Sequence, residues 1–142
     1  SIYSATKIAL FNKFNFFFKL KKMQFNWCRL FYLYGDGESE NRLYPYITKM
    51  LKDNKEVELQ NKDFIRDYIN VKSATKEILE ISLQKKYFGP LNICSAFGKS
   101  IENIAIEIAK PLNKEHLIKF SNKKPKNVDI DTIVGIKDIN YK

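Results

Sequence analysis

The run Phe25-Asn26-Trp27-Cys28-Arg29-Leu30-Phe31-Tyr32-Leu33-Tyr34 is nearly continuous in apolar and aromatic residues, and it stops at Gly35-Asp36-Gly37. A short apolar run that ends at turn-forming glycines is typical of a strand buried on both faces, as in a parallel sheet, followed by a loop. We therefore expect residues 25–34 to form a strand that is buried on both faces and is followed by a loop.

Helical and extended patterns alternate on both sides of this run. Residues 3–22 place phenylalanine and aliphatic side chains over much of a helix circumference, so this helix needs burial on more than one side. Further along, the patterns predict helices over 42–53, 73–84 and 101–110, and extended segments over 56–59, 66–71, 91–94 and 117–120. Ser100 is the expected N-cap of the last helix, which Pro111 ends. The alternation predicts an α/β fold with at least part of a parallel sheet.

The chain has 142 residues and a net charge of +9, and 22 of its 25 basic residues are lysine. This length suits one domain with a real core, and the 44% hydrophobic content indicates a globular chain rather than a disordered one. Lysine clusters at residues 19–22 and 123–126 lack the arginine and aromatic interleaving of a nucleic-acid surface. We expect solvated lysine faces and no nucleic-acid partner.

Two cysteines, Cys28 and Cys94, both lie in apolar runs, and the chain has a single histidine, His116. These counts favour reduced thiols over a disulfide and exclude a histidine-rich metal site, so we expect no metal. No signal-peptide pattern is present, and polar residues interrupt the apolar stretch 8–20 well short of a membrane span. We therefore expect a cytoplasmic protein. Because the chain starts without Met inside a predicted helix, we also expect it to be a fragment.

Tyr3 and Lys7 are four residues apart, a spacing that places both side chains on one face of a helix. A lysine ammonium beside a phenol stabilises the phenolate, and such a tyrosine can exchange a proton with a sugar or alcohol oxygen. Taken alone the spacing is weak evidence, because a solvated helix turn carries Tyr-x-x-x-Lys by chance. Its weight depends on the segments that follow.

Four segments occur in the order typical of one enzyme family. They are Tyr3-Ser4-Ala5-Thr6-Lys7, Arg29-Leu30-Phe31-Tyr32-Leu33-Tyr34-Gly35, Arg66-Asp67-Tyr68-Ile69-Asn70-Val71, and Leu91-Asn92-Ile93-Cys94-Ser95 with Ser100-Ile101. Together they resemble the extended short-chain dehydrogenase/reductases, the NAD-dependent epimerase/dehydratase family that acts on nucleotide-activated sugars. The resemblance covers residues 1 to about 110, whereas beyond Lys119 it fades.

The resemblance implies the C-terminal part of a Rossmann-type NAD(P)-binding fold plus a smaller α/β substrate-binding domain. Residues 1–35 would be the remnant of the Rossmann domain, and residues 36–142 the nucleotide-sugar region. The N-terminal glycine-rich half would be lacking, since no Gly-x-x-Gly-x-x-Gly or Gly-x-Gly-x-x-Gly loop occurs in the sequence. We therefore expect NAD or NADP to be the cofactor of the intact enzyme, and the chain alone to be inactive.

The resemblance also implies roles for individual residues. Tyr3 would be the acid/base, and Lys7 would hold the nicotinamide ribose. Leu30, Phe31 and Leu33 would line the nicotinamide pocket. Two residues would contact the nucleotide-sugar substrate, Tyr32 and Arg66, the latter through the diphosphate because a planar guanidinium suits phosphate. An exposed ion pair with Asp63 or Asp67 is the alternative role for Arg66.

The sequence departs from the family pattern at the substrate positions. Tyr32 stands where an asparagine is common, Asn70 replaces histidine, and Lys72-Ser73 replaces an acidic pair. The sugar and the choice among epimerase, dehydratase and reductase stay open, with a leaning toward 4-keto-6-deoxyhexose reductases. The resemblance further implies a homodimer formed through the helix at residues 3–22. A non-catalytic interaction module that uses this phenylalanine-rich helix is the alternative.

Overall fold

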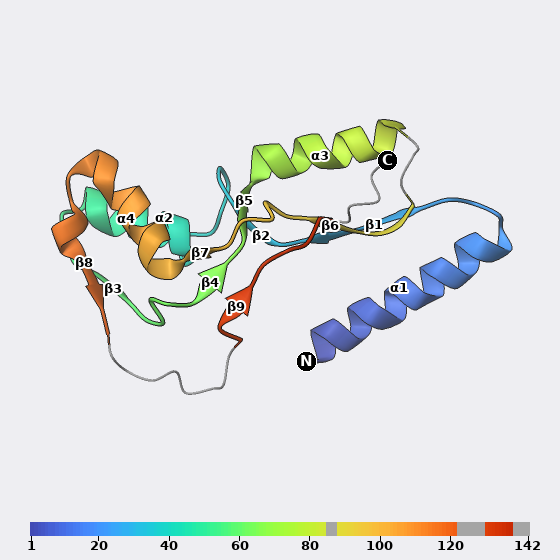
Figure 1. The fold of residues 1–142 in the computed structure, drawn as a ribbon, viewed down its shortest axis with the longest axis horizontal. Coiled ribbons are helices and arrows are strands. Elements are labelled where there is room, and N and C mark those ends of the chain that lie inside the picture. The colour runs from blue at the N-terminus through green and yellow to red at the C-terminus, as the bar shows by residue number, and fades with distance from the viewer. Residues whose placement is uncertain (85–87, 122–129, 138–142) are drawn as a thin grey trace.

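A computed structural model describes residues 1–84, 88–121 and 130–137 of the chain. Figure 1 shows helix α1 on one side of the β1–β6 strand pair and helix α3 on the other, with α2 and α4 grouped at the far end of the molecule. The helices are α1 (Ile2–Leu20), α2 (Leu43–Lys52), α3 (Val71–Gln84) and α4 (Ile101–Ala109), with short 3-10 turns η1 (Lys110–Leu112) and η2 (Glu115–Leu117). The strands are β1 (Asn26–Leu30), β2 (Tyr32–Tyr34), β3 (Val57–Leu59), β4 (Ile65–Arg66), β5 (Tyr68–Asn70), β6 (Gly89–Ile93), β7 (Lys99–Ser100), β8 (Ile118–Phe120) and β9 (Thr132–Ile133).

The expected α/β class with parallel strands is confirmed. β1 pairs in parallel with β6, β2 with β5, and β3 with β8. The expected single strand over residues 25–34 is instead divided at Phe31, because β1 and β2 pair with different partner strands. Phe31 still donates its backbone N–H to the Ile93 carbonyl at 3.1 Å, so the backbone passes from one partner to the other without a turn.

The expectation that this run is buried on both faces is wrong for the described chain. The residues of β1 and β2 are half-buried or exposed, and Leu30 is 53% exposed. Among the described strands, β1 has one neighbour only, so its second edge is not shielded by another strand. The backbone N–H and C=O groups along that edge therefore have no partner strand among the described residues.

Helix α1 is held against the sheet by aromatic contacts. Phe11 lies 5.5 Å from Trp27, and Phe18 stacks on Phe25 at 4.9 Å between ring centroids. No residue of α1 is buried, and its outward face exposes large apolar side chains such as Phe16, which is 66% exposed. We expected α1 to be covered on more than one side, but in the described chain only the side that faces Trp27 and Phe25 is covered.

Two clusters of buried side chains form the core. One lies between the sheet and α3 and is made of Ile69, Ala74, Ile81, Leu91 and Ile93. The other joins α2, α4, β3 and β8 and is made of Ile47, Leu51, Val57, Leu59, Ala105, Ala109 and Ile118. The expected cap on α4 is confirmed, since the Ser100 hydroxyl accepts a hydrogen bond from the Asn103 N–H at 3.0 Å.

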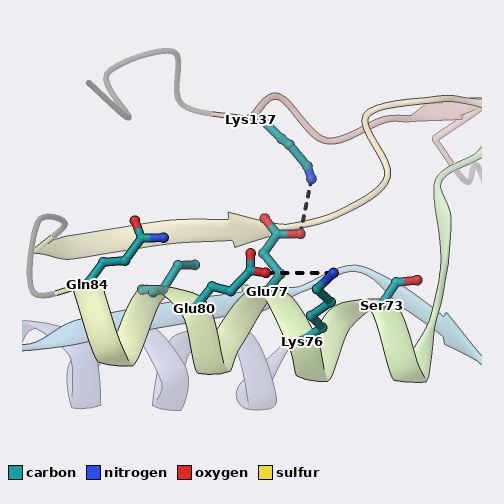
Figure 2. A pocket seen from close by; sticks show the side chains of 7 residues that line it. Ser73, Lys76, Glu77, Glu80, Gln84 and Lys137 are labelled. Carbon is teal, nitrogen blue, oxygen red and sulfur yellow. Dashed lines mark hydrogen bonds and ion pairs between the residues drawn. The ribbon is translucent and has the colours of Figure 1, made fainter.

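The C-terminal described segment, residues 130–137, crosses back over the sheet. β9 pairs in parallel with β4, and the Asn92 side chain donates to the Ile136 carbonyl at 2.8 Å. Lys137 then pairs with Glu77 of α3 at 3.0 Å (Figure 2). Strands β1 and β2 precede the expected domain boundary at residue 35, and their partners β6 and β5 follow it. The division into two domains stays a prediction. The lysine cluster at residues 123–126 lies outside the described residues.

Candidate active site

Tyr3 and Lys7 lie together at the wall of an open cavity of about 490 Å³ between α1 and β1. The Lys7 ammonium is 5.6 Å from the centroid of the Tyr3 ring, within the range of a cation–π contact. Tyr3 is 72% exposed, so its phenol is accessible from solvent. Of the three residues expected at the nicotinamide pocket, Leu30 also lines this cavity. The structure therefore brings Tyr3, Lys7 and Leu30 together.

The position of the pair depends on how α1 sits against β1. Phe11 and Phe14 contact Trp27, with ring centroids 5.5 and 6.4 Å apart. On an α-helix, residues separated by four or by seven positions share a face, so Lys7 and Phe11 face the same way as Phe14. The aromatic contacts thus turn the Tyr3–Lys7 side of the helix toward the strand.

Two further polar residues of β1 line the cavity, and the sequence reasoning gave neither a role. Arg29 is exposed and adds a second cation to the cavity lining, from β1, whereas Lys7 lines it from α1. Burial raises the pKa of the Cys28 thiol, with a smaller contribution from the Glu77 carboxylate. The thiol is therefore held protonated. Arg29 heads the segment that carries the family resemblance, which was the available signal for it.

Phe31, Leu33 and Tyr32 lie away from this cavity. Phe31 is half-buried and lies against Gly135, where an added Cβ would come within 3.1 Å of the Phe31 ring. Leu33 packs against the core under α3. Tyr32 contacts the ring of Tyr68 at 5.3 Å between centroids.

Arg66, the expected diphosphate contact, is 7% exposed. Its Nη1 donates to the carbonyls of Ile65 and Asp131, both at 2.9 Å, and its guanidinium lies 4.9 Å from the Phe64 ring centroid. The alternative role for Arg66, an exposed ion pair, is wrong in that the Arg66 side chain is buried. The side chain links β4 to the segment that enters β9.

Asp67, expected from the sequence only as a possible exposed ion-pair partner of Arg66, is a fully buried carboxylate that joins three segments. Oδ1 accepts from the Ser95 N–H at 2.8 Å and from the Ser95 hydroxyl at 2.6 Å. Oδ2 accepts from the N–H groups of Ala96 and Gly135, both at 3.0 Å. The four hydrogen bonds that Asp67 accepts show a carboxylate with a structural role.

A separate groove of about 420 Å³ runs between α3 and the end of the C-terminal segment. Figure 2 shows that its charged side chains are already paired, Lys137 with Glu77 and Lys76 with Glu80. Within the described residues, no group of three or more His, Cys, Asp or Glu side chains could hold a metal ion. Both cysteines are free. None of the described helices is long and apolar enough to cross a membrane.

No family model and no curated protein matches the sequence of the chain. Solved structures with a similar fold do exist. The chain is similar to UDP-N-acetylglucosamine 4-epimerase from Methanobrevibacter ruminantium, solved with UDP-N-acetylmuramic acid, with a TM-score of 0.82 and 19% identity over 96% of this chain. It is also similar to the NAD complex of UDP-glucose 4-epimerase from Thermus thermophilus, with a TM-score of 0.78 and 15% identity over 94% of this chain.

A third similar structure is the NAD complex of dTDP-glucose 4,6-dehydratase from Bacillus anthracis, with a TM-score of 0.69 and 17% identity over 84% of this chain. This chain spans 38% of that protein and 45% of each of the two epimerases, so it covers less than half of their length. The chain therefore has an α/β fold that matches part of the fold of NAD-dependent nucleotide-sugar epimerases and dehydratases.

Proposed function

We propose that the chain carries the proton-transfer site of an NAD(P)-dependent nucleotide-sugar epimerase, dehydratase or 4-ketoreductase. The observation that carries the proposal is the shared cavity of Tyr3, Lys7 and Leu30. The similarity of the fold to epimerases and a dehydratase supports it. The free thiols of Cys28 and Cys94 agree with a cytoplasmic setting, which we include in the proposal.

In this proposal the Tyr3 phenol gives a proton to, or takes one from, the sugar oxygen at the reacting carbon. We propose that the nicotinamide end of the cofactor occupies this cavity, where Lys7 would hold ribose hydroxyls and Leu30 would supply an apolar wall. NAD(P) supplies the hydride acceptor and donor when it is bound. Phe31 and Leu33 are further proposed contacts to the nicotinamide, although neither lines the Tyr3–Lys7 cavity in the structure.

Tyr32 and Arg66 are the proposed contacts to the nucleotide sugar. Tyr32 follows the cavity-lining strand and contacts Tyr68, two residues after Arg66. Because Arg66 is buried and donates to two carbonyls, a diphosphate would have to approach next to β4 and compete with these contacts. The proposal thus assigns Arg66 a double role, holding β4 to residue 131 and contacting phosphate.

We further propose that the 142-residue chain alone binds the cofactor weakly and has no measurable turnover. Its sequence contains no glycine-rich phosphate-binding loop, and the Tyr3–Lys7 cavity is open. The test has two parts. Assays with UDP- and dTDP-sugars and NAD(H) should show no turnover, and saturation-transfer NMR with NADH should show weak contact at the nicotinamide protons.

Lys7→Ala should abolish that NMR contact, whereas Lys13→Ala, an exposed lysine on the same helix, should leave it unchanged. Equal effects of the two variants would contradict the proposed site. Robust NAD(H)-dependent turnover by the chain alone would contradict the proposed inactivity.

The second candidate function is a non-catalytic interaction module, favoured by the exposed apolar face of α1. Phe16, Phe17 and Leu20 are each about half or more exposed. In either function we propose a homodimer formed through this helix. Sedimentation should show a dimer that Phe16→Ser weakens, whereas Leu83→Ser, an exposed leucine on α3, should not change it. A monomer at all concentrations would contradict the dimer.

A further inference from the structure

Strand β1 lies beside β6 (Figure 1), and the backbone bonds between them show which of its groups face the other, free edge. The Phe25 carbonyl accepts from the Gly89 N–H at 2.7 Å, and the Phe31 N–H donates to the Ile93 carbonyl at 3.1 Å. Backbone groups of a strand alternate between its two edges from one residue to the next. The odd-numbered residues of this run therefore bond toward β6.

The even-numbered residues of β1 turn their backbone N–H and C=O groups to the free edge. These residues are Asn26, Cys28 and Leu30, and none of the described strands pairs with them there. The Asn26 side chain also lacks a partner within the described part of the chain, because its Oδ1 is buried and accepts no hydrogen bond. An edge with unpaired donors and acceptors at regular spacing is a template for a further strand.

The border of this edge is apolar. Ile8 of α1 is 62% exposed and Leu30 is 53% exposed, and both line the open cavity between α1 and β1. Strand β1 contains neither proline nor lysine, two residues with which proteins block their free edges. The edge is therefore open to pairing, and its border favours a partner with apolar side chains.

The charges beside the edge determine which partner strand fits. Lys7 of α1 and Arg29 of β1 both line the cavity, and none of the other described residues that line it is acidic. The chain as a whole has a net charge of +9. A second copy of this chain would bring the same two cations against Lys7 and Arg29, whereas an acidic segment would neutralise them.

We propose that the free edge of β1 is a docking site for an extended, apolar and acidic segment of a partner polypeptide. The segment adds as a strand, with its backbone bonded to Asn26, Cys28 and Leu30. It places an apolar side chain against Ile8 and a carboxylate at Arg29. The inference goes beyond the proposed proton-transfer function and does not rest on it, because strand pairing uses backbone groups of β1 and not the side chains to which that function assigns the reaction.

The test uses a capped peptide of alternating valine and threonine around a central aspartate, added to the ¹⁵N-labelled chain and followed by NMR. Hydrogen exchange should slow about tenfold at the amides of Cys28 and Leu30 when the peptide is bound. The amides of Trp27 and Arg29 already face β6 and should change little, so they are an internal control. This alternation distinguishes strand addition from a general stabilisation of the chain.

Two modified peptides separate strand addition from other modes of binding. N-methylation at alternate residues places the methyl groups either toward β1 or away from it, depending on which set of amides is methylated. One methylated peptide should bind about tenfold more weakly than the unmodified peptide, because it loses backbone hydrogen bonds, and the other should bind as the unmodified peptide does. Equal binding of the two methylated peptides, or no binding of any peptide, overturns the proposal.

Variants of the full chain test the charge preference. Arg29→Gln should weaken binding of the aspartate peptide about threefold. Because Arg29 is exposed, this variant should fold normally. Lys13→Gln, at an exposed lysine of α1 that does not line the cavity, is the matched control and should bind as the unchanged chain does. Equal binding by the two variants overturns the proposal.

Two last measurements identify the occupant. A peptide with lysine in place of the aspartate should bind more weakly than the aspartate peptide. Sedimentation should show that the peptide leaves the oligomeric state of the chain unchanged. The proposal is overturned if the lysine peptide binds as tightly, or if the peptide dissociates a dimer, since a second copy of the chain would then occupy the edge.

Discussion

Asp67 Oδ2 accepts a hydrogen bond from the backbone N–H of Gly135 at 3.0 Å, across 68 positions of sequence. The same carboxylate accepts from Ser95 and Ala96, so it joins the junction of β4 and β5 to the loop after β6 and to the C-terminal segment. Because Asp67 is fully buried, these bonds replace the hydration that the carboxylate loses on folding.

We expect Asp67→Asn to lower the free energy of unfolding by about 2–3 kcal/mol. The amide nitrogen of asparagine would face N–H donors and leave at least one of them unpaired. Urea denaturation followed by circular dichroism measures the loss. Asp63→Asn, at an exposed position, is the control and should change stability little. Equal stability of the two variants would show that the buried network contributes little.

Gly135→Ala tests how closely the C-terminal segment packs on the end of β6. An added Cβ would lie 2.5 Å from both the Cβ and the Sγ of Cys94, a distance that the backbone must increase. We expect a loss of about 1–3 kcal/mol in the free energy of unfolding, as for overpacked cores. Thermal unfolding gives this value, and an unchanged midpoint would mean that the segment is not seated as described.

Trp27→Ala should release α1 from the sheet. Trp27 contacts Phe11 and Phe14, and the helix has no buried residue of its own to hold it. Hydrogen exchange should show about tenfold less amide protection over Ile2–Leu20, while α4 keeps its protection. Trp27→Phe retains an aromatic ring and should recover most of the protection. Loss of protection in both helices would instead indicate global destabilisation.

Stability should fall in alkaline solution because of the cluster of Tyr34, Tyr44 and Tyr68. Burial, followed by the neighbouring phenol of Tyr34, raises the pKa of Tyr44 above its ordinary value of 10 in the folded state. Above about pH 10 the unfolded chain releases the phenol proton while the folded chain retains it, so the stabilisation is complete below pH 10 and is lost as the pH rises through the folded value. Urea midpoints measured from about pH 8 to about pH 11 should fall more steeply for the unchanged chain than for Tyr44→Phe. Parallel curves would contradict the assignment.

The candidate site could be predicted from sequence only where it depends on neighbours along the chain. Tyr3 and Lys7 share a helix face because of their spacing, and the structure places them in one cavity. Helix spacing gives no such guide to the strand residues, and the sequence analysis placed Leu30, Phe31 and Leu33 together although only Leu30 lines the cavity. Their accessibility depends on Gly135 and on α3, which pack against them from distant parts of the sequence.

The sequence by itself determined the local elements of this protein. Helix α4 begins after Ser100 because a serine side chain accepts a hydrogen bond within one turn, and α1 forms from a run without Gly or Pro. Only the tertiary structure decided where the long apolar run divides, at Phe31, and that Asp67 is a buried junction. The apolar run divides because its two parts pair with β6 and β5. Asp67 is a junction because it accepts hydrogen bonds from residues 95–96 and 135. Strand pairing and carboxylate burial depend on groups brought together across dozens of residues, and no local pattern specifies which groups those are.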